Sequence, residues 1–238
     1  MKKLLLFAGI SLFISFEALS QNEKLPNARE IVEKYFEAIG GRASLSKVNS
    51  WMFSGKLTSI SGTNVPLRVW IKGTNSRAEM TIMGQKLISV QRDDLAWEFN
   101  PFKSNRLEKT DTVIGNMPFD FSKRIFPESL INIDGLTRKR EVYDRARKKV
   151  KVGAEILLDS LPVFKVTVYP NSEIHKEEYY FDKKSFLLVR SKASGLDLLL
   201  KRYHNTNIGV MIPQNLISWS DSKIEGESII IDKIKLNT

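Results

Sequence analysis

Few side chains in this sequence are spaced in a way that supports catalysis or metal binding. The two histidines, His175 and His204, lie 29 positions apart, and His175 precedes Lys-Glu-Glu, which is not the helix pattern of zinc proteases. Ser44 and Lys47 match the Ser-x-x-Lys pattern of serine acylases, but the partner motifs of that mechanism are missing. The absence of cysteine excludes disulfides, thiol nucleophiles and cysteine-ligated metals. The residues therefore predict a protein that is not an enzyme and holds no metal or cofactor.

The N-terminal residues have the layout of a secretory signal peptide. Lys2 and Lys3 give a basic start, residues 4–16 form an apolar run, and small residues precede Gln21. The run is shorter than the roughly 20 residues that a helix needs to span a bilayer. The sequence therefore predicts that residues 1–20 are removed and that residues 21–238 form a single exported domain. Gln21 stands where an exported lipoprotein would carry cysteine, so no lipid anchor is expected.

The chain has 238 residues, 42% of them hydrophobic, and a formal net charge of +10. This apolar content excludes a disordered chain and is sufficient for a sizeable core. In an exported protein without RNA-binding motifs, the charge does not predict a nucleic-acid partner. Much of it lies in residues 138–151, which form either a solvated surface or a patch that steers the protein to an anionic membrane or an acidic partner. The basic residues of this segment are Arg138, Lys139, Arg140, Arg145, Arg147, Lys148, Lys149 and Lys151.

One helix followed by many strands would position any site in this chain. Asn27 and Glu30 have the spacing of a capping box, and apolar residues then recur at helical spacing until Gly40 and Gly41. A short second helix is expected over residues 42–48. Beyond it, strand-like runs separated by turn residues predict a mainly β fold with a large antiparallel sheet. The predicted strands cover residues 51–60, 66–72, 77–83, 86–91, 95–100, 149–158, 163–169, 177–182, 186–192, 197–203, 211–218 and 228–236.

A more apolar pattern interrupts the strands over residues 115–135. Pro118 and Pro127 bracket its centre, and the pattern favours two short helices. A strongly curved sheet must cover its concave side, and this segment and the N-terminal helix are the elements available for that. If these two elements fill the concave side, the result is an ordinary core, and if they do not, the result is an apolar cavity. The sequence is compatible with both. The candidate lid residues are Phe119, Phe121, Ile125 and Phe126.

Two blocks of sequence carry a resemblance to a known family. A Trp-Ile-Lys block at residues 70–72 precedes a turn and Arg77, and 20 residues after Arg77 the chain reads Trp-Glu-Phe-Asn-Pro-Phe at residues 97–102. This arrangement resembles the LolA-type family of outer-membrane lipoprotein carriers. The end of the first predicted helix and residues 179–182 and 208–213 resemble a lipoprotein-sorting branch of the same superfamily.

The resemblance implies an α+β fold in which helices lid the concave face of an unclosed antiparallel half-barrel. It implies a soluble, monomeric periplasmic carrier that shields the acyl chains of a lipid or lipoprotein. An inner-membrane complex would donate the cargo and an outer-membrane protein would accept it. A lipid-sensing regulatory domain on the same scaffold is the alternative. Burying acyl chains requires only an apolar surface, at about 0.8 kcal/mol per methylene group, so neither function needs a catalytic motif.

The expected site residues follow from strand alternation and from the resemblance. Arg77 occupies the position of the family's lid-closing arginine, but alternation points it outward, where it would be a solvated side chain paired with Glu79. Both interpretations stay open. An apolar stripe on a strand can pack in the core or contact a ligand. Both alternatives therefore also stay open for the cavity residues. The cavity candidates are Leu67, Val69, Ile71, Trp97 and Phe99.

Overall fold

The N-terminal helix begins where its capping residues predict. The computed structural model describes residues 25–73, 75–93, 95–110, 150–152, 156–169, 176–193, 196–220 and 227–237. Helix α1 (Ala28–Ala38) starts with a complete capping box, in which the Glu30 amide donates to Asn27 Oδ1 at 3.0 Å and the Asn27 amide to Glu30 Oε2 at 2.9 Å. Helix α2 (Arg42–Leu45) follows after two glycines. Neither described helix is long and apolar enough to cross a membrane.

An antiparallel sheet makes up most of the remaining described chain. Its N-terminal strands are β1 (Ser50–Thr58), β2 (Asn64–Lys72), β3 (Asn75–Ile82), β4 (Gln85–Arg92), β5 (Leu95–Phe99) and β6 (Leu107–Thr110). Its C-terminal strands are β7 (Val150–Val152), β8 (Ile156–Leu158), β9 (Leu161–Val168), β10 (Glu177–Asp182), β11 (Leu188–Ala193), β12 (Leu196–Asn205), β13 (Met211–Ser220) and β14 (Glu227–Leu236). The strand order is β6-β5-β4-β3-β2-β1-β14-β13-β12-β11-β10-β9-β7, and β8 also pairs with β9. The predicted mainly β, antiparallel fold is confirmed.

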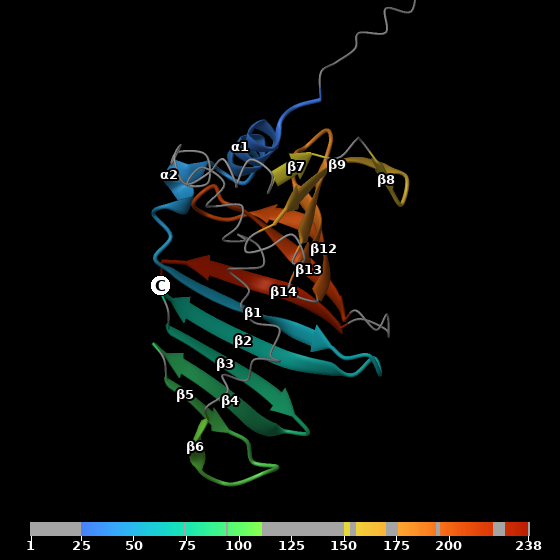
Figure 1. Ribbon diagram of the computed structural model, residues 1–238. Coiled ribbons are helices and arrows are strands. Elements are labelled where there is room, and N and C mark those ends of the chain that lie inside the picture. Colours follow the sequence, from blue (N-terminus) through green and yellow to red (C-terminus); the bar gives the residue numbers. More distant parts are fainter. Residues whose placement is uncertain are drawn as a thin grey trace, which may run out of the picture.

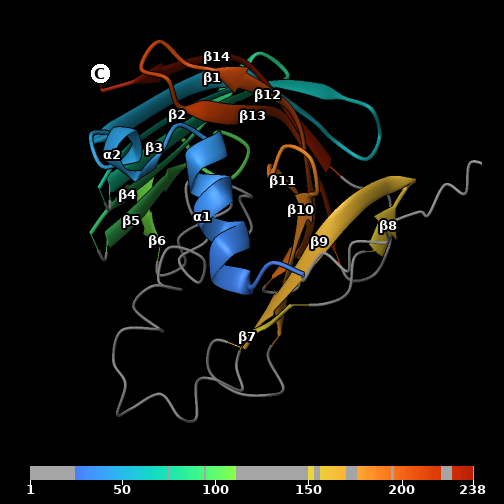
Figure 2. The same ribbon diagram turned by 90° about the horizontal axis from the view of Figure 1, so that it is seen from above.

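The sheet is strongly curved, and α1 lies inside the curve. Figure 1 shows the N-terminal strands on one side of the molecule and the C-terminal strands on the other. Figure 2 shows α1 within the concavity. The sheet ends at β6 and β7, which lie at opposite ends of the strand order, so the half-barrel is unclosed as expected. The residues that connect these two strands, 111–149, lie outside the described residues.

Strands β1 and β14 join the two groups of strands in the middle of the sheet. They pair antiparallel along their length, with a bulge after Ser54. The next residue is Gly55, and a Cβ atom there would stand 2.0 Å from the Ile230 carbonyl oxygen. Only glycine allows the two backbones to approach so closely. This contact therefore helps to hold the N-terminal and C-terminal strands in one sheet.

The C-terminal end of α1 is fixed to the turn between β12 and β13. The Met211 amide donates to the Ile39 carbonyl oxygen at 3.0 Å. Gly40 has φ +112° and packs so closely on this turn that a Cβ atom would lie 2.3 Å from the Gly209 carbonyl oxygen. The helix therefore docks through its backbone as well as through its buried side chains.

Two predicted elements differ from the structure, and one strand of the structure was not predicted. The second helix ends at Leu45 and does not reach residue 48. The strand predicted over residues 149–158 is two short strands, β7 and β8, which both pair with β9. Strand β6 was not predicted, because its four residues include one large apolar side chain, Leu107, and show no clear alternation. Several predictions fall outside the described residues: residues 1–20, the lid residues Phe119, Phe121, Ile125 and Phe126, and residues 138–149 of the basic segment.

Candidate functional site

The concave face is mostly apolar on β1 to β3, whereas on β4 and β5 it also contains Ser89 and Glu98. Leu67, Met80 and Leu87 lie opposite one another across β2, β3 and β4, and Val69 lies opposite Phe53 of β1. All five side chains are buried. The alternation that predicted an apolar stripe in β2 thus continues across neighbouring strands. Of the cavity candidates, this face contains Leu67, Val69 and Ile71.

Helix α1 packs against the concave face of the C-terminal strands. Its Tyr35 ring lies edge-on to Phe181 of β10, with the ring centroids 5.5 Å apart. The Tyr203 hydroxyl donates to the Leu188 carbonyl oxygen at 2.8 Å. Burial raises the pKa of both Tyr35 and Tyr203, so these hydroxyl groups stay neutral. The helix and both groups of strands contribute to one continuous cluster of buried apolar side chains.

Where the structure describes them, the histidine, serine and lysine considered for catalysis lie on separate elements. His204 is exposed on β12, and His175 lies outside the described residues. Ser44 lies in the single turn of α2 and Lys47 follows it as an exposed side chain. Among the described residues, no three His, Asp or Glu side chains are grouped so as to hold a metal ion. The concave face carries a continuous cluster of buried apolar side chains.

Trp97 and Phe99 lie on the other, outer face of the sheet. The register places Phe99 in one row with Glu79 and Arg68, on the side away from Leu67. Alternation correctly puts Trp97 and Phe99 on a shared face, but it cannot tell which face that is. The structure therefore does not bring these two aromatic residues together with the concave set.

Arg77 also lies on the outer face. Its Nε and Nη2 atoms donate to Glu79 Oε1 at 2.8 and 2.6 Å, and 47% of its side chain is exposed. This is the solvated, Glu79-paired arginine that alternation predicts. The lid residues that Arg77 would have to contact lie outside the described residues. A gating role for Arg77 therefore stays a prediction.

The Asn-Pro-Phe block forms the turn between β5 and β6. Asn100 Oδ1 accepts a hydrogen bond from the Phe102 amide at 3.1 Å, and Asn100 Nδ2 donates to Glu98 Oε1 at 3.0 Å. The Asn100 carbonyl oxygen accepts from the amides of Lys103 and Ser104, both at 2.9 Å. Asparagine suits such a turn because its side chain bonds to the backbone that follows it. The most specific motif of the resemblance thus has a structural role.

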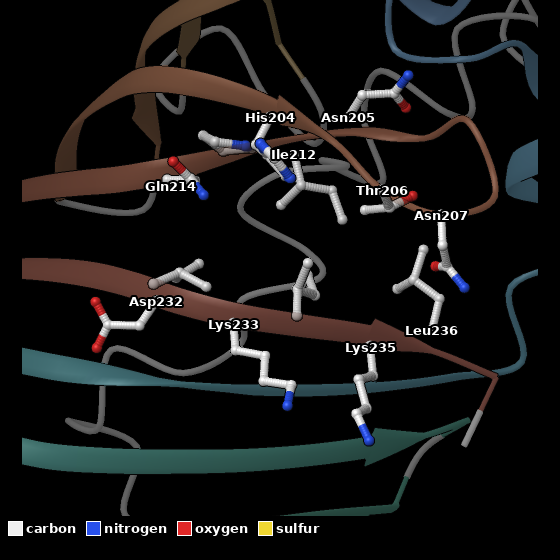
Figure 3. Close-up of a pocket in the computed structure, with 13 residues that line it drawn as sticks. His204, Asn205, Thr206, Asn207, Ile212, Gln214, Asp232, Lys233, Lys235 and Leu236 are labelled. Atoms are coloured by element: carbon white, nitrogen blue, oxygen red, sulfur yellow. The ribbon is translucent and has the colours of Figure 1, made fainter.

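A pocket of about 380 Å³ lies between β13 and β14 (Figure 3). The two strands pair only where residues 215–218 face residues 227–230, and they diverge beyond that point. Pro213 has no amide hydrogen, and the Met211 amide is bonded to Ile39 of α1. Neither residue can therefore donate to β14, which explains why the pairing stops. Sequence reasoning missed this pocket, although a proline inside a predicted strand is a signal of interrupted pairing.

The pocket has an apolar interior and a polar rim. Figure 3 shows Ile212 and Leu236 projecting into the space between the strands, and both side chains are buried. Lys233 and Lys235 of β14 and His204 of β12 are exposed at its margin. The lysines belong to the same surface as the outer faces of β1 and β2, with which β14 is continuous.

Charged side chains on the outer face of the C-terminal strands are largely paired with one another. Lys165 Nζ lies 2.7 Å from Glu178 Oε1. The Arg190 guanidinium donates to both carboxylate oxygens of Asp197, and Lys192 Nζ lies 3.3 Å from the same carboxylate. Desolvation opposes ionisation of Asp197, but these cations outweigh it and lower its pKa. On this part of the outer face, Glu178 and Asp197 are therefore each paired with two cations.

No protein-family model and no curated protein sequence matches this chain. Among solved structures, it is similar to a DUF1329 family protein from Desulfovibrio piger, with a TM-score of 0.52 over 87% of this chain and 92% of that chain. This chain has the fold of that protein. At 10% sequence identity the likeness is one of fold alone.

Two further structures show looser likenesses. One is a putative outer membrane lipoprotein-sorting protein domain from Vibrio parahaemolyticus, with a TM-score of 0.47 and 11% identity over 87% of this chain and 94% of that chain. The other is the lipoprotein LppX of Mycobacterium tuberculosis, with a TM-score of 0.30 and 9% identity over 87% of this chain and 93% of that chain.

Proposed function

We propose that this protein is a carrier that holds the acyl chains of a lipid or lipoprotein against the concave face of its sheet. The observation that carries the proposal is the continuous cluster of buried apolar side chains that α1 and both groups of strands form on that side. Such a surface stabilises a bound chain by about 0.8 kcal/mol for each methylene group that leaves water. The hydroxyl groups of Tyr35 and Tyr203 stay neutral because burial raises their pKa. They therefore place no charge beside a bound acyl chain.

The binding residues are proposed to come from the concave face of β2 to β4. Leu67, Val69 and Ile71 were expected from the sequence, and the register adds Met80 and Leu87 as neighbours. We expect Phe119, Phe121, Ile125 and Phe126 to supply further apolar cover. The only requirement on the surface is that it separates acyl chains from water, so the proposed activity involves no covalent chemistry.

The proposed route is periplasmic. The signal-like residues 1–20 and the motifs of the LolA-type resemblance support export of residues 21–238 as one soluble, monomeric domain. An inner-membrane complex would then load the carrier and an outer-membrane acceptor would unload it. Recovery of the protein from the periplasmic fraction, with residue 21 at its N-terminus, is the expected result for this part of the proposal.

The experiment is native mass spectrometry of the protein expressed from its full-length coding sequence in a bacterium with two membranes. We expect a mass increment that is released by organic solvent and identified as an acyl-bearing molecule. Met80→Trp should reduce the ligand-bound fraction because the larger ring fills the concave face. Ile88→Trp, on the next strand but on the outer face, is the matched control and should leave it unchanged.

The folded state of both variants is checked by circular dichroism before the ligand is measured. Whether the protein carries an acyl ligand is decided by the wild type alone, even if Met80→Trp does not fold. A wild-type protein that carries no acyl ligand, and takes none up from lipoprotein-bearing membranes, would contradict the proposed function.

A further inference from the structure

The outer face of the N-terminal strands and β14 is strongly basic. The register aligns its side chains in cross-strand rows, one of which places Arg68 beside Glu79 and another Lys72 beside Asn75. All its cations are exposed except Lys56, which is half-buried. We call this surface the basic outer face. Its cations are Lys56, Arg68, Lys72, Arg77, Lys86, Arg92, Lys109, Lys233 and Lys235.

The positive charge of this face is barely compensated. Among the described residues of this face, the carboxylates are Glu79, which is paired with Arg77 at 2.6 Å, and Asp232 at the bulge of β14. The nine cations therefore exceed the carboxylates by seven charges. On the C-terminal strands, by contrast, Lys165 and Arg190 have carboxylate partners in the same face. Charge is thus distributed unevenly over one continuous sheet.

Large apolar side chains lie among these cations. One cross-strand row runs from Trp70 through Arg77 and Val90 to Trp97, and all four side chains reach the surface at least in part. At the β6 end of the same face, Leu107 is 59% exposed. Tryptophan side chains are typical of membrane interfaces, where the ring is at the level of the lipid headgroups. Lysine and arginine beside them attract anionic headgroups.

We propose that the basic outer face docks onto the surface of a membrane that contains anionic lipids. The excess of seven positive charges supplies long-range attraction to such a surface. The tryptophans and exposed leucines supply apolar contacts that a bilayer accepts between its headgroups. A nucleic acid would meet the same cations, but exposed aliphatic side chains such as Leu95 and Leu107 would have no apolar partner on its backbone.

This docking would turn the concave face away from the bilayer. Because α1 lies on the concave side and the cations lie on the other, the two surfaces can act independently. The cations of the proposed contact also differ from those of residues 138–151, for which the sequence left open a solvated surface or a patch that faces an anionic membrane or an acidic partner. Loss of membrane binding would therefore leave any acyl ligand in place, and the two proposals can fail separately.

The experiment uses the protein recovered after expression of its full-length coding sequence and measures its binding to phosphatidylcholine vesicles with and without phosphatidylglycerol, by co-flotation. The test variant is Arg68→Gln/Lys72→Gln/Lys233→Gln. The matched control, Lys34→Gln/Lys47→Gln/Lys184→Gln, removes the same charge from exposed lysines outside the basic outer face. Each lost cation near the membrane should weaken binding about fivefold, so the test variant should bind about 100-fold more weakly. The control should bind within a few-fold of wild type.

A second measurement examines the aromatic contact. Brominated lipids in the anionic vesicles should quench the fluorescence of the bound protein. Trp97→Phe should reduce the quenched fraction, whereas Trp219→Phe, on the outer face of the C-terminal strands, should not. Absence of binding to anionic vesicles, equal weakening of both triple variants, or binding to nucleic acid without binding to vesicles would each overturn the proposal.

Discussion

Glu178 on β10 is held as a carboxylate by three donors on the outer face of the C-terminal strands. Lys165 Nζ, Lys176 Nζ and the Tyr180 hydroxyl lie 2.7, 3.2 and 3.0 Å from its oxygen atoms. Desolvation favours the protonated acid, but the hydrogen bonds from Lys165, Lys176 and Tyr180 outweigh it and lower the pKa of Glu178 to about 2. Replacing Glu178 by glutamine should therefore destabilise the fold.

The lowered pKa sets the size and the pH dependence of this effect. A shift from 4.5 to about 2 corresponds to roughly 3.5 kcal/mol at about 1.4 kcal/mol per pKa unit. Lys176 is 60% exposed and contributes little in water, so about 2 kcal/mol is the expected loss at neutral pH. Because the pKa is lower in the folded state, this stabilisation is complete above about pH 4.5 and disappears as the pH falls through 2.

Urea unfolding of wild type and Glu178→Gln at several pH values between neutral and acid measures this contribution. The difference in unfolding free energy should be about 2 kcal/mol at neutral pH and should shrink as the pH falls below 4.5. Glu37→Gln, an exposed residue of α1, is the control and should stay within about 0.5 kcal/mol of wild type. A Glu178→Gln difference below about 0.5 kcal/mol, or one that does not change with pH, would refute the reasoning.

Two further changes test how the sheet and the helix are built. Gly55→Ala should lower the unfolding free energy by about 3 kcal/mol, because the new Cβ would lie 2.0 Å from the Ile230 carbonyl oxygen. Thermal unfolding measures it, and an unchanged melting temperature would show that β1 and β14 can move apart. Asn27→Ala should cost about 1 kcal/mol by removing the capping box of α1. Urea unfolding checks this value, with Asn64→Ala in the exposed start of β2 for comparison.

The local pattern of the sequence predicts most strands, since apolar and polar residues alternate wherever one face is buried. The predicted strand over residues 95–100 is β5, and the run over residues 177–182 is β10. Alternation within one strand does not, however, assign a face. Trp97 shares a face with Arg77 and not with Leu67 only because of the register through β4 and β3. That register depends on pairings between strands, which a single strand does not encode.

Local backbone irregularities are also not predicted by the alternation of apolar and polar residues. Arg202 has φ +56° in the middle of β12, and the alternation changes there. As a result, both Arg202 and His204 are exposed, while Tyr203 packs against the core and bonds to Leu188. The pocket beside β13 depends in the same way on the position of Pro213 and on a bond from Met211 to α1. Such features arise from tertiary packing and override the strand periodicity.

The pairing of β1 with β14 has a consequence for how the chain folds. These neighbours are far apart in sequence, as shown by the hydrogen bond from the Asn49 amide to Asn237 Oδ1, 188 positions away. Strands β1 to β6 can form step by step as consecutive hairpins, but the centre of the sheet cannot close until residues 227–236 have been synthesised. Contacts over such separations slow folding and leave strand edges open in the meantime. During most of its synthesis, the nascent chain therefore lacks the partner for one edge of β1, the edge that later pairs with β14. That edge is meanwhile available to a chaperone or to aggregation.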